Sequence, residues 1–311
     1  MEYIDFEEEN KFWLPVEQVD GSIKMTKYHS NFQVAGDTDS CYMRIPEEFN
    51  ILEKGEMIEF CDQIASITND GFDGFCKSAF NMPESRFGTI AADREAVSDK
   101  SLFLSKKRYI MHLVNMEGKD VDKLKIMGVE IIKSDTSKFT KKILMDVVNM
   151  ILDGKQREEV LATIKERKSM IYDAELHDLA TPAGCRTILK AYKQLEETGG
   201  LKGIHFTARS AIFYNTLCGD KDQKIRAGDK IGIIYIKNTK SKYLGFPKDA
   251  TYLPEWMDDI VIDYDTHWDK SFKKIENYLE SMGWDNKSMT QSIRSNLFGI
   301  EIKPKTKGKK K

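Results

Sequence analysis

The chain has 311 residues, 41% of them hydrophobic, and a formal net charge of −2 at pH 7, a composition that predicts a folded, soluble protein with one large core or two modest ones. No apolar run approaches the roughly eighteen residues of a membrane span and the first residues do not form a signal peptide, so we expect a cytoplasmic protein without a membrane partner. Its five cysteines are widely spaced and include no Cys-x-x-Cys, which supports neither a disulfide framework nor a zinc site.

Charge is distributed unevenly along the chain. Residues 1–75 carry seventeen acids and five bases, a balance of −12, whereas residues 100–142 carry eleven bases and five acids, a balance of +6. Residues 303–311 add six lysines and no acid, which predicts a basic flexible tail over 301–311. Because local basic segments govern contact with phosphate more than the overall charge does, nucleic-acid binding is not excluded.

The first thirty residues predict a charged lead and then a hairpin, with strands at 16–19 and 22–25 joined by Asp20-Gly21. This segment resembles no family, and it is either a flexible lead or a contact surface for another chain. A second hairpin is predicted over 32–43, where short apolar runs flank a turn that contains Gly36-Asp37-Thr38-Asp39-Ser40.

Asp37 and Asp39 are the first candidate site residues. With one residue between them on a hairpin, their side chains point to the same side, and two carboxylates held so close repel unless a cation lies between them. Hard oxygen ligands of this kind select Mg²⁺ or Mn²⁺. An isolated Asp-x-Asp is also compatible with a solvated turn, or with the diphosphate site of a glycosyltransferase, which would need a nucleotide-binding domain upstream for which 36 residues leave no room.

The remaining pattern predicts an α+β fold. A helix is expected at 56–68, strands at 107–115 and 127–132, and a helix that begins after Thr136 or Ser137 and ends near Gly154. Further elements are expected in the second half of the chain: helices at 157–171, 186–197, 209–218 and 268–282, and strands at 231–236 and 243–246.

Several more motifs follow the acidic hairpin in a characteristic order. They are Asp93-Arg94-Glu95, Lys106-Lys107-Arg108-Tyr109, the segment 124–130, and Ser134-Asp135-Thr136-Ser137-Lys138. With the string Gly36-Asp37-Thr38-Asp39-Ser40, their sequence and spacing resemble family B DNA polymerases, in particular the replicative enzymes of T-even bacteriophages. The resemblance is strong over 32–138, diffuse through the following helices, and recovers at 205–214 and 257–284.

The resemblance implies a palm portion at 31–136, with a partial antiparallel sheet, and a mainly helical thumb at 137–300. It implies a DNA-directed DNA polymerase that uses two Mg²⁺ ions, with Asp39 as a bridging ligand, Asp37 beside it and Glu95 holding an outer-shell water. From the residues alone, Asp93 and Glu95 would form an ordinary surface pair with Arg94.

The basic cluster Lys106, Lys107, Arg108 and Tyr109 suits a duplex minor groove, where base pairs present acceptors at the same places. The alternative is a solvated basic strand edge. Lys125, Lys133 and Lys138 are expected to add salt-dependent phosphate contacts. Weaker candidates are Arg209 and Tyr214, for which a core or capping role is equally compatible.

The resemblance also implies partners. Residues 295–300 resemble the short peptide that binds the sliding clamp, with Leu297 and Phe298 as anchors. The exonuclease domain, the fingers and a further palm aspartate are missing, so we expect activity only with an N-terminal partner that supplies them, on primer-template DNA and dNTP, in the host cytoplasm if the chain is phage-encoded. The alternative is a non-catalytic remnant that binds duplex DNA or the clamp.

Overall fold

The computed structural model of the protein describes residues 11–17, 23–29, 33–36, 40–45 and 53–284. The chain divides into two compact units. Unit 1 contains residues 1–99 and 112–124, and unit 2 contains 100–111 and 125–311. Strands β5, β6 and β7 contribute residues to both units.

Two antiparallel hairpins open unit 1. Strands β1 (Lys11–Glu17) and β2 (Ile23–His29) pair from Lys11 with His29 to Glu17 with Ile23. This confirms the first predicted hairpin with longer strands, and its predicted turn lies outside the described residues. Strands β3 (Gln33–Gly36) and β4 (Cys41–Met43) also pair antiparallel, which confirms the second hairpin.

Helix α2 (Lys54–Phe80) follows and is longer than the predicted 56–68. It begins with a capping box in which Glu56 accepts from the backbone N–H of Glu53 at 2.8 Å. It ends at Asn81, which takes the left-handed conformation with φ 54°.

Strands β5 (Ala96–Ser105), β6 (Arg108–Met116) and β7 (Lys119–Met127) form a three-stranded sheet in that order. Their two-residue connections require antiparallel neighbours. β6 confirms the predicted strand at 107–115, whereas β5 and β7 were not predicted. The strand predicted at 127–132 is wrong, because β7 ends at Met127 and the chain then turns, with Lys133 N–H donating to Glu130 O at 3.3 Å.

His112 joins the three strands in unit 1. Its Nδ1 lies 2.6 Å from Asp99 of β5 and its Nε2 lies 2.7 Å from Asp122 of β7. The hydrogen bonds to Asp122 and to Asp99 raise the pKa of His112 above its ordinary 6.5. The protonated imidazole can donate from both nitrogens, so it satisfies both carboxylates at once.

We expect His112 to make stability depend on pH. Because its pKa is higher in the folded chain than in the unfolded one, its contribution is fully present below pH 6.5 and is lost as the pH rises through the folded pKa. The difference in urea midpoint between wild type and His112→Asn, measured from pH 5 to 9, should therefore shrink with rising pH. A difference that is constant or grows would contradict this assignment.

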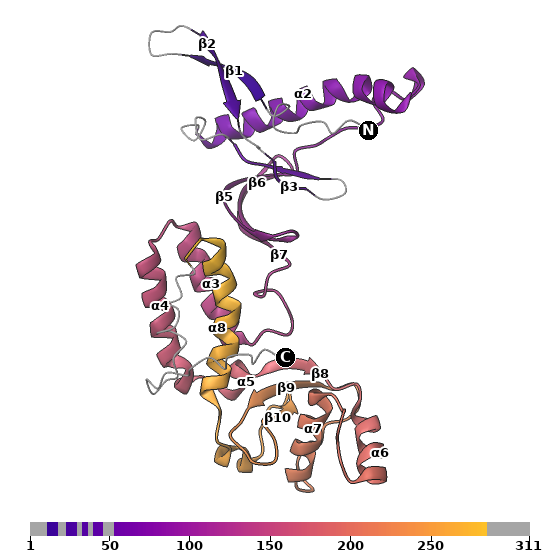
Figure 1. Ribbon diagram of the computed structural model, residues 1–311, viewed down its shortest axis with the longest axis vertical. Helices are drawn as coiled ribbons and strands as arrows, with labels where there is room; N and C mark the ends of the chain where they lie inside the picture. The colour runs from indigo at the N-terminus through magenta and orange to yellow at the C-terminus, as the bar shows by residue number, and fades with distance from the viewer. Residues whose placement is uncertain (1–10, 18–22, 30–32, 37–39, 46–52, 285–311) are drawn as a thin grey trace, which may run out of the picture. The chain divides into compact units, whose positions relative to one another are not determined.

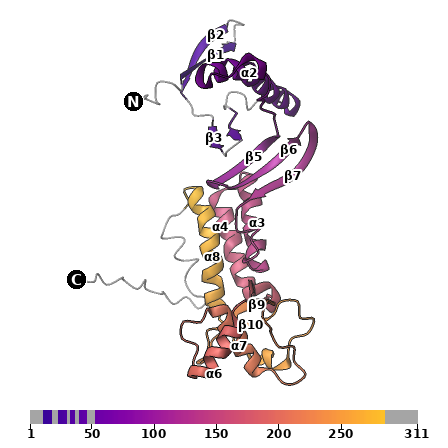
Figure 2. The same ribbon diagram turned by 90° about the vertical axis from the view of Figure 1, so that its right-hand side faces the viewer.

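Unit 2 contains a helical bundle and a small sheet (Figures 1 and 2). Helix α3 (Lys138–Leu152) contacts α4 (Arg157–Ser169) and α8 (Tyr264–Ser281). Ser137 caps α3 by accepting from Thr140 N–H, as predicted. The bundle core comprises Ile143, Leu144, Val147, Val148, Val160, Leu161, Ile164, Trp268, Phe272, Ile275 and Leu279, all buried.

The sheet has β9 (Lys230–Tyr235) between β8 (Thr181–Gly184) and β10 (Tyr243–Pro247), with antiparallel pairing on both sides. Helix α7 (Phe206–Leu217) contacts β9 and β10, and α6 (Ile188–Thr198) packs on α7. The other elements are α5 (Leu176–Leu179) and the short 3-10 helices η2 (Glu84–Arg86), η3 (Met170–Asp173) and η4 (Glu255–Asp259). The fold is α+β, as predicted, and the helices and strands expected after residue 136 are confirmed.

Candidate functional site

The acidic hairpin is described up to its loop. Gly36 of β3 pairs with Cys41 of β4, so Asp37 and Asp39 belong to the four-residue connection between paired strands. Both aspartates lie outside the described residues, and their metal-binding role stays a prediction. Among the residues that are described, no group of three His, Cys, Asp or Glu side chains gathers in a way that could hold a metal ion.

Glu95 is exposed and directly precedes β5 in unit 1. Its backbone carbonyl accepts from Glu117 N–H at 2.8 Å. The neighbouring Arg94 pairs with Asp62 of α2 and donates to Asn115 of β6 at 2.8 Å. Arg94 thus holds the start of β5 in place. The predicted role of Glu95, to hold an outer-shell water of the metal site, stays a prediction.

The basic cluster forms a tight turn in unit 2. Lys106 and Lys107 are the two residues between β5 and β6, and both are exposed. Lys107 has φ 60°, a conformation that costs a lysine about 1–2 kcal/mol and that glycine would adopt freely. Positive φ is what a two-residue hairpin connection requires, so the turn between β5 and β6 imposes this conformation on Lys107.

The next two residues of the cluster are placed differently. Arg108 Nη2 donates to both carboxylate oxygens of Glu130 at 2.6 Å, so its charge is already neutralised within the chain. Tyr109 is 7% exposed, and its ring centroid lies 5.4 Å from that of Phe103. Lys106 and Lys107 are therefore the members of the cluster that face solvent.

The other predicted lysines are dispersed over unit 2. Lys125 is half-buried on β7, Lys133 lies 3.3 Å from Glu130, and Lys138 lies 3.4 Å from Asp178. Of the two weaker candidates, Arg209 is exposed on α7, whereas Tyr214 is 1% exposed and belongs to the core. Leu297 and Phe298, the predicted clamp anchors, lie outside the described residues.

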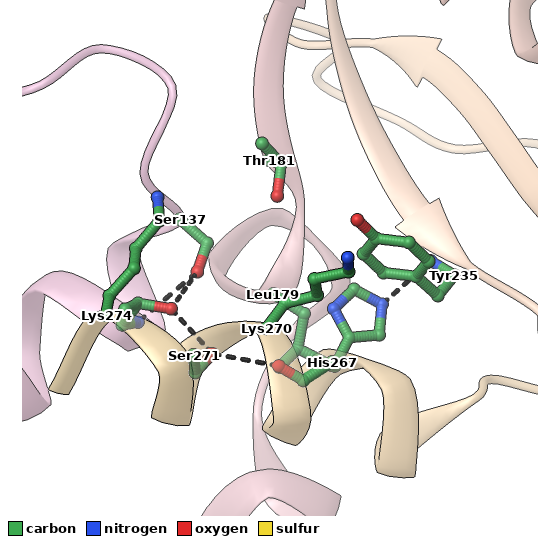
Figure 3. A pocket seen from close by; sticks show the side chains of 9 residues that line it. Ser137, Leu179, Thr181, Tyr235, His267, Lys270, Ser271 and Lys274 are labelled. Atoms are coloured by element: carbon green, nitrogen blue, oxygen red, sulfur yellow. Dashed lines mark hydrogen bonds between the residues drawn. The ribbon is translucent and has the colours of Figure 1, made fainter. Parts of the chain in front are cut away.

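Sequence reasoning missed a polar pocket where the start of α3 meets α8 (Figure 3). Ser137 and Thr140 contribute hydroxyls 2.8 Å apart, and Thr140 Oγ1 lies 2.7 Å from Ser271 Oγ. Lys270 and Lys274 line the same pocket from α8, four residues apart and hence on one face of the helix. The four-residue spacing of the two lysines was visible in the sequence. The hydroxyl of Thr140, which lines the same pocket, is 131 positions away from that of Ser271 and could not be connected with α8 from the sequence.

Only the lysines give this pocket charge at neutral pH. His267 lines it too, but its Nε2 accepts from Tyr235 N–H at 2.9 Å, and burial lowers its pKa to about 4. Burial also lowers the pKa of Lys274, which donates to Thr136 Oγ1 at 2.7 Å. Two ammonium groups beside the N-terminal end of α3, whose dipole is positive, favour an anion such as a phosphate oxygen.

Comparison with known proteins places the chain in a family. Residues 6–282 match the model of DNA polymerase family B, and the chain therefore belongs to this family. Among its relatives are the DNA-directed DNA polymerases of Escherichia phage RB69 and Enterobacteria phage T4, each 25% identical over 82% of this chain. The DNA polymerase catalytic subunit of Saimiriine herpesvirus 2 (strain 11) is 22% identical over 86% of it.

The chain corresponds to a limited part of these proteins. The matches span 30% of the RB69 polymerase, 31% of the T4 polymerase and 26% of the herpesvirus subunit. The region is similar to the T-even phage enzymes, as the motifs indicated. Within the described residues, no helix is both long enough and apolar enough to cross a membrane.

Proposed function

We propose that this chain supplies the metal-binding palm hairpin and the thumb of a family B DNA polymerase. In this role it holds primer-template DNA and contributes carboxylates to the transfer of a nucleotide from dNTP to the primer 3′ oxygen. The family match over residues 6–282 carries the proposal. The exposed cations of the Lys106-Lys107 turn support it, because they lie where the family motif predicts contact with the duplex.

The polar pocket gives the duplex a second contact in this proposal. A backbone phosphate would accept hydrogen bonds from the ammonium groups of Lys270 and Lys274, and it would lie near the positive end of the α3 dipole. Such contacts recognise every sequence equally, since they involve only the DNA backbone. That property suits an enzyme that copies any template.

The donor set of the acidic hairpin fits Mg²⁺, because Asp37 and Asp39 offer hard carboxylate oxygens. The bound ions would orient the primer 3′ oxygen and stabilise the charge on the leaving pyrophosphate. In this proposal Asp39 bridges the ions, Asp37 lies beside it, and Glu95 orients a water. The remaining carboxylate ligand, the fingers and the exonuclease belong to the part of the polymerase that this chain does not match.

Reconstitution tests the proposal. The chain combined with the N-terminal two thirds of its polymerase, joined to it or added separately, should extend a labelled primer on a template with Mg²⁺ and dNTP. The chain without that portion should bind the primer-template but not extend it. Binding without any extension by the combined protein would favour the non-catalytic role, and absence of binding would reject both roles.

We expect the pocket lysines to contribute strongly to DNA binding. The double variant Lys270→Ala/Lys274→Ala should bind a labelled duplex about tenfold more weakly, and the slope of log K against log salt should fall by about 1, since one phosphate contact is lost. Fluorescence anisotropy over a salt series measures both quantities. The control Lys190→Ala/Lys193→Ala removes the same charge from exposed positions on α6, and its affinity should change by less than about twofold. Equal losses in the two double variants would show that only net charge matters.

A further inference from the structure

The carboxylate of Glu130 is the meeting point of three elements of unit 2. Its side chain is 10% exposed, and it accepts from Arg108 Nη2 through both oxygens at 2.6 Å. Lys133 Nζ lies 3.3 Å away. The third element is α8, where burial and the negative charge of Glu130 raise the pKa of the Tyr278 hydroxyl.

Two buried polar atoms beside this ion pair have no hydrogen-bond partner. They are Arg108 Nε and the hydroxyl of Tyr278, a residue that is fully buried. Buried polar groups are normally satisfied, and each exception calls for an explanation. The carboxylate of Glu130 therefore receives hydrogen bonds from Arg108 Nη2 and from Lys133 Nζ, but none from Arg108 Nε or from the Tyr278 hydroxyl.

The segment that carries Glu130 lies between the basic turn and α8. On one side, a Cβ at Gly128 would lie 2.2 Å from the carbonyl oxygen of Lys107, so the turn packs directly on this segment. On the other side, Lys274 of α8 donates to Thr136 Oγ1 at 2.7 Å. The position of the turn is thus connected to α8 through residues 128–136.

We propose that Glu130 is a positioning residue for the DNA contact made by the Lys106-Lys107 turn. Glu130 holds Arg108, the residue that directly follows the turn, and through it the turn itself. Arg108 then acts by anchoring the turn rather than by touching DNA. This inference rests on the proposed function, in which the exposed lysines of the turn contact the duplex.

The proposal predicts a change in DNA affinity opposite to the one that charge alone would cause. Glu130→Gln removes a negative charge near the duplex, which by charge alone should strengthen DNA binding. If Glu130 positions the turn, the same change should weaken binding about fivefold, because an ion pair becomes a weaker hydrogen bond between the guanidinium and a neutral amide. The control Asp135→Asn removes an exposed acid five residues away and should leave the affinity unchanged or slightly higher.

Tyr278→Phe serves as a second control beside the same carboxylate. It keeps the ring and removes only a buried hydroxyl without a partner, so the thermal midpoint should stay the same or rise. Because this hydroxyl makes no hydrogen bond to Glu130, the affinity for duplex DNA should stay within about twofold of the wild type. A loss of affinity as large as that of Glu130→Gln would show that the effect is not specific to the Arg108–Glu130 pair.

The experiment uses the full chain and a fluorescent hairpin primer-template DNA, with affinities from anisotropy and, without DNA, amide hydrogen exchange of residues 106–108. Weaker binding and faster exchange in Glu130→Gln, but not in Asp135→Asn or Tyr278→Phe, would support the proposal. Unchanged or tighter binding by Glu130→Gln, or unchanged exchange, would overturn it. If Glu130→Gln does not fold, Glu130→Asp, which keeps the charge but draws the carboxylate back from Arg108, decides by the same two measurements. If the wild-type chain binds no duplex, the proposed function fails, and the exchange rates still decide whether the turn is positioned in this way.

Discussion

Replacing Asp39 with Asn is expected to reduce primer extension by the complete polymerase by about 10³-fold or more. A bridging carboxylate is shared by both metal ions, and the charge that these ions stabilise in the transition state is worth several kcal/mol. Each 1.36 kcal/mol changes the rate about tenfold. Asn has almost the same size as Asp, so folding should be retained, and single-turnover extension measures the chemical step.

Three comparisons make the Asp39 result specific. Asp37→Asn should cost less, about tenfold, if this residue binds the ions less directly. Asp70→Asn, an exposed position on α2, should leave the rate unchanged. The affinity of Asp39→Asn for primer-template DNA should equal or exceed that of the wild type, because an acid is removed. A variant at Asp39 that retains more than about a tenth of the rate would exclude it as a bridging ligand.

Replacing Gly128 with Ala is expected to destabilise unit 2 by about 3 kcal/mol. Part of the loss arises because Gly128 has φ 65°, where an L side chain costs about 1–2 kcal/mol. The rest arises because the new Cβ would lie 2.2 Å from Lys107 O, a backbone atom that can move only with the whole turn. Urea denaturation measures the change in unfolding free energy.

Gly154 provides the matched control for this prediction. It has a similar φ of 69°, but a Cβ there would meet nothing within 4 Å. Gly154→Ala should therefore cost only the conformational part, about 1 kcal/mol. Equal losses of unfolding free energy at the two positions would mean that the backbone of the turn moves away from the new Cβ at little cost. A larger loss at Gly128 accompanied by weaker DNA binding would show that the contact fixes the position of Lys107.

The helices illustrate how much local pattern can predict. The stripe of apolar residues that includes Ile143 and Val147, preceded by Ser137, placed α3 almost to the residue, because capping and a 3.6-residue period depend only on neighbours in sequence. The strand predicted at 127–132 failed for the opposite reason. Val129, Glu130 and Ile131 are all buried, so burial does not alternate as it would in a strand with one exposed face, and Gly128 is held in a left-handed turn against Lys107.

The basic cluster at residues 106–109 likewise shows which features of the site the sequence could predict and which it could not. Its motif identified Lys106 and Lys107 as exposed cations, but it did not distinguish them from Arg108, which pairs with Glu130, or from the buried Tyr109. Burial and ion pairing depend on residues that meet only after the chain has folded. A contiguous string of similar residue types therefore concealed two different environments.

Family, α+β class and the order of most helices and strands followed from motifs and periodicity, since these depend on residues close together in the chain. Folding was needed to create the polar pocket, in which Thr140 and Ser271 meet across 131 positions, and to bring Glu130 to Arg108 across 22 positions. Contacts between residues so distant in sequence leave no periodic signal, because each partner satisfies its own local pattern without reference to the other.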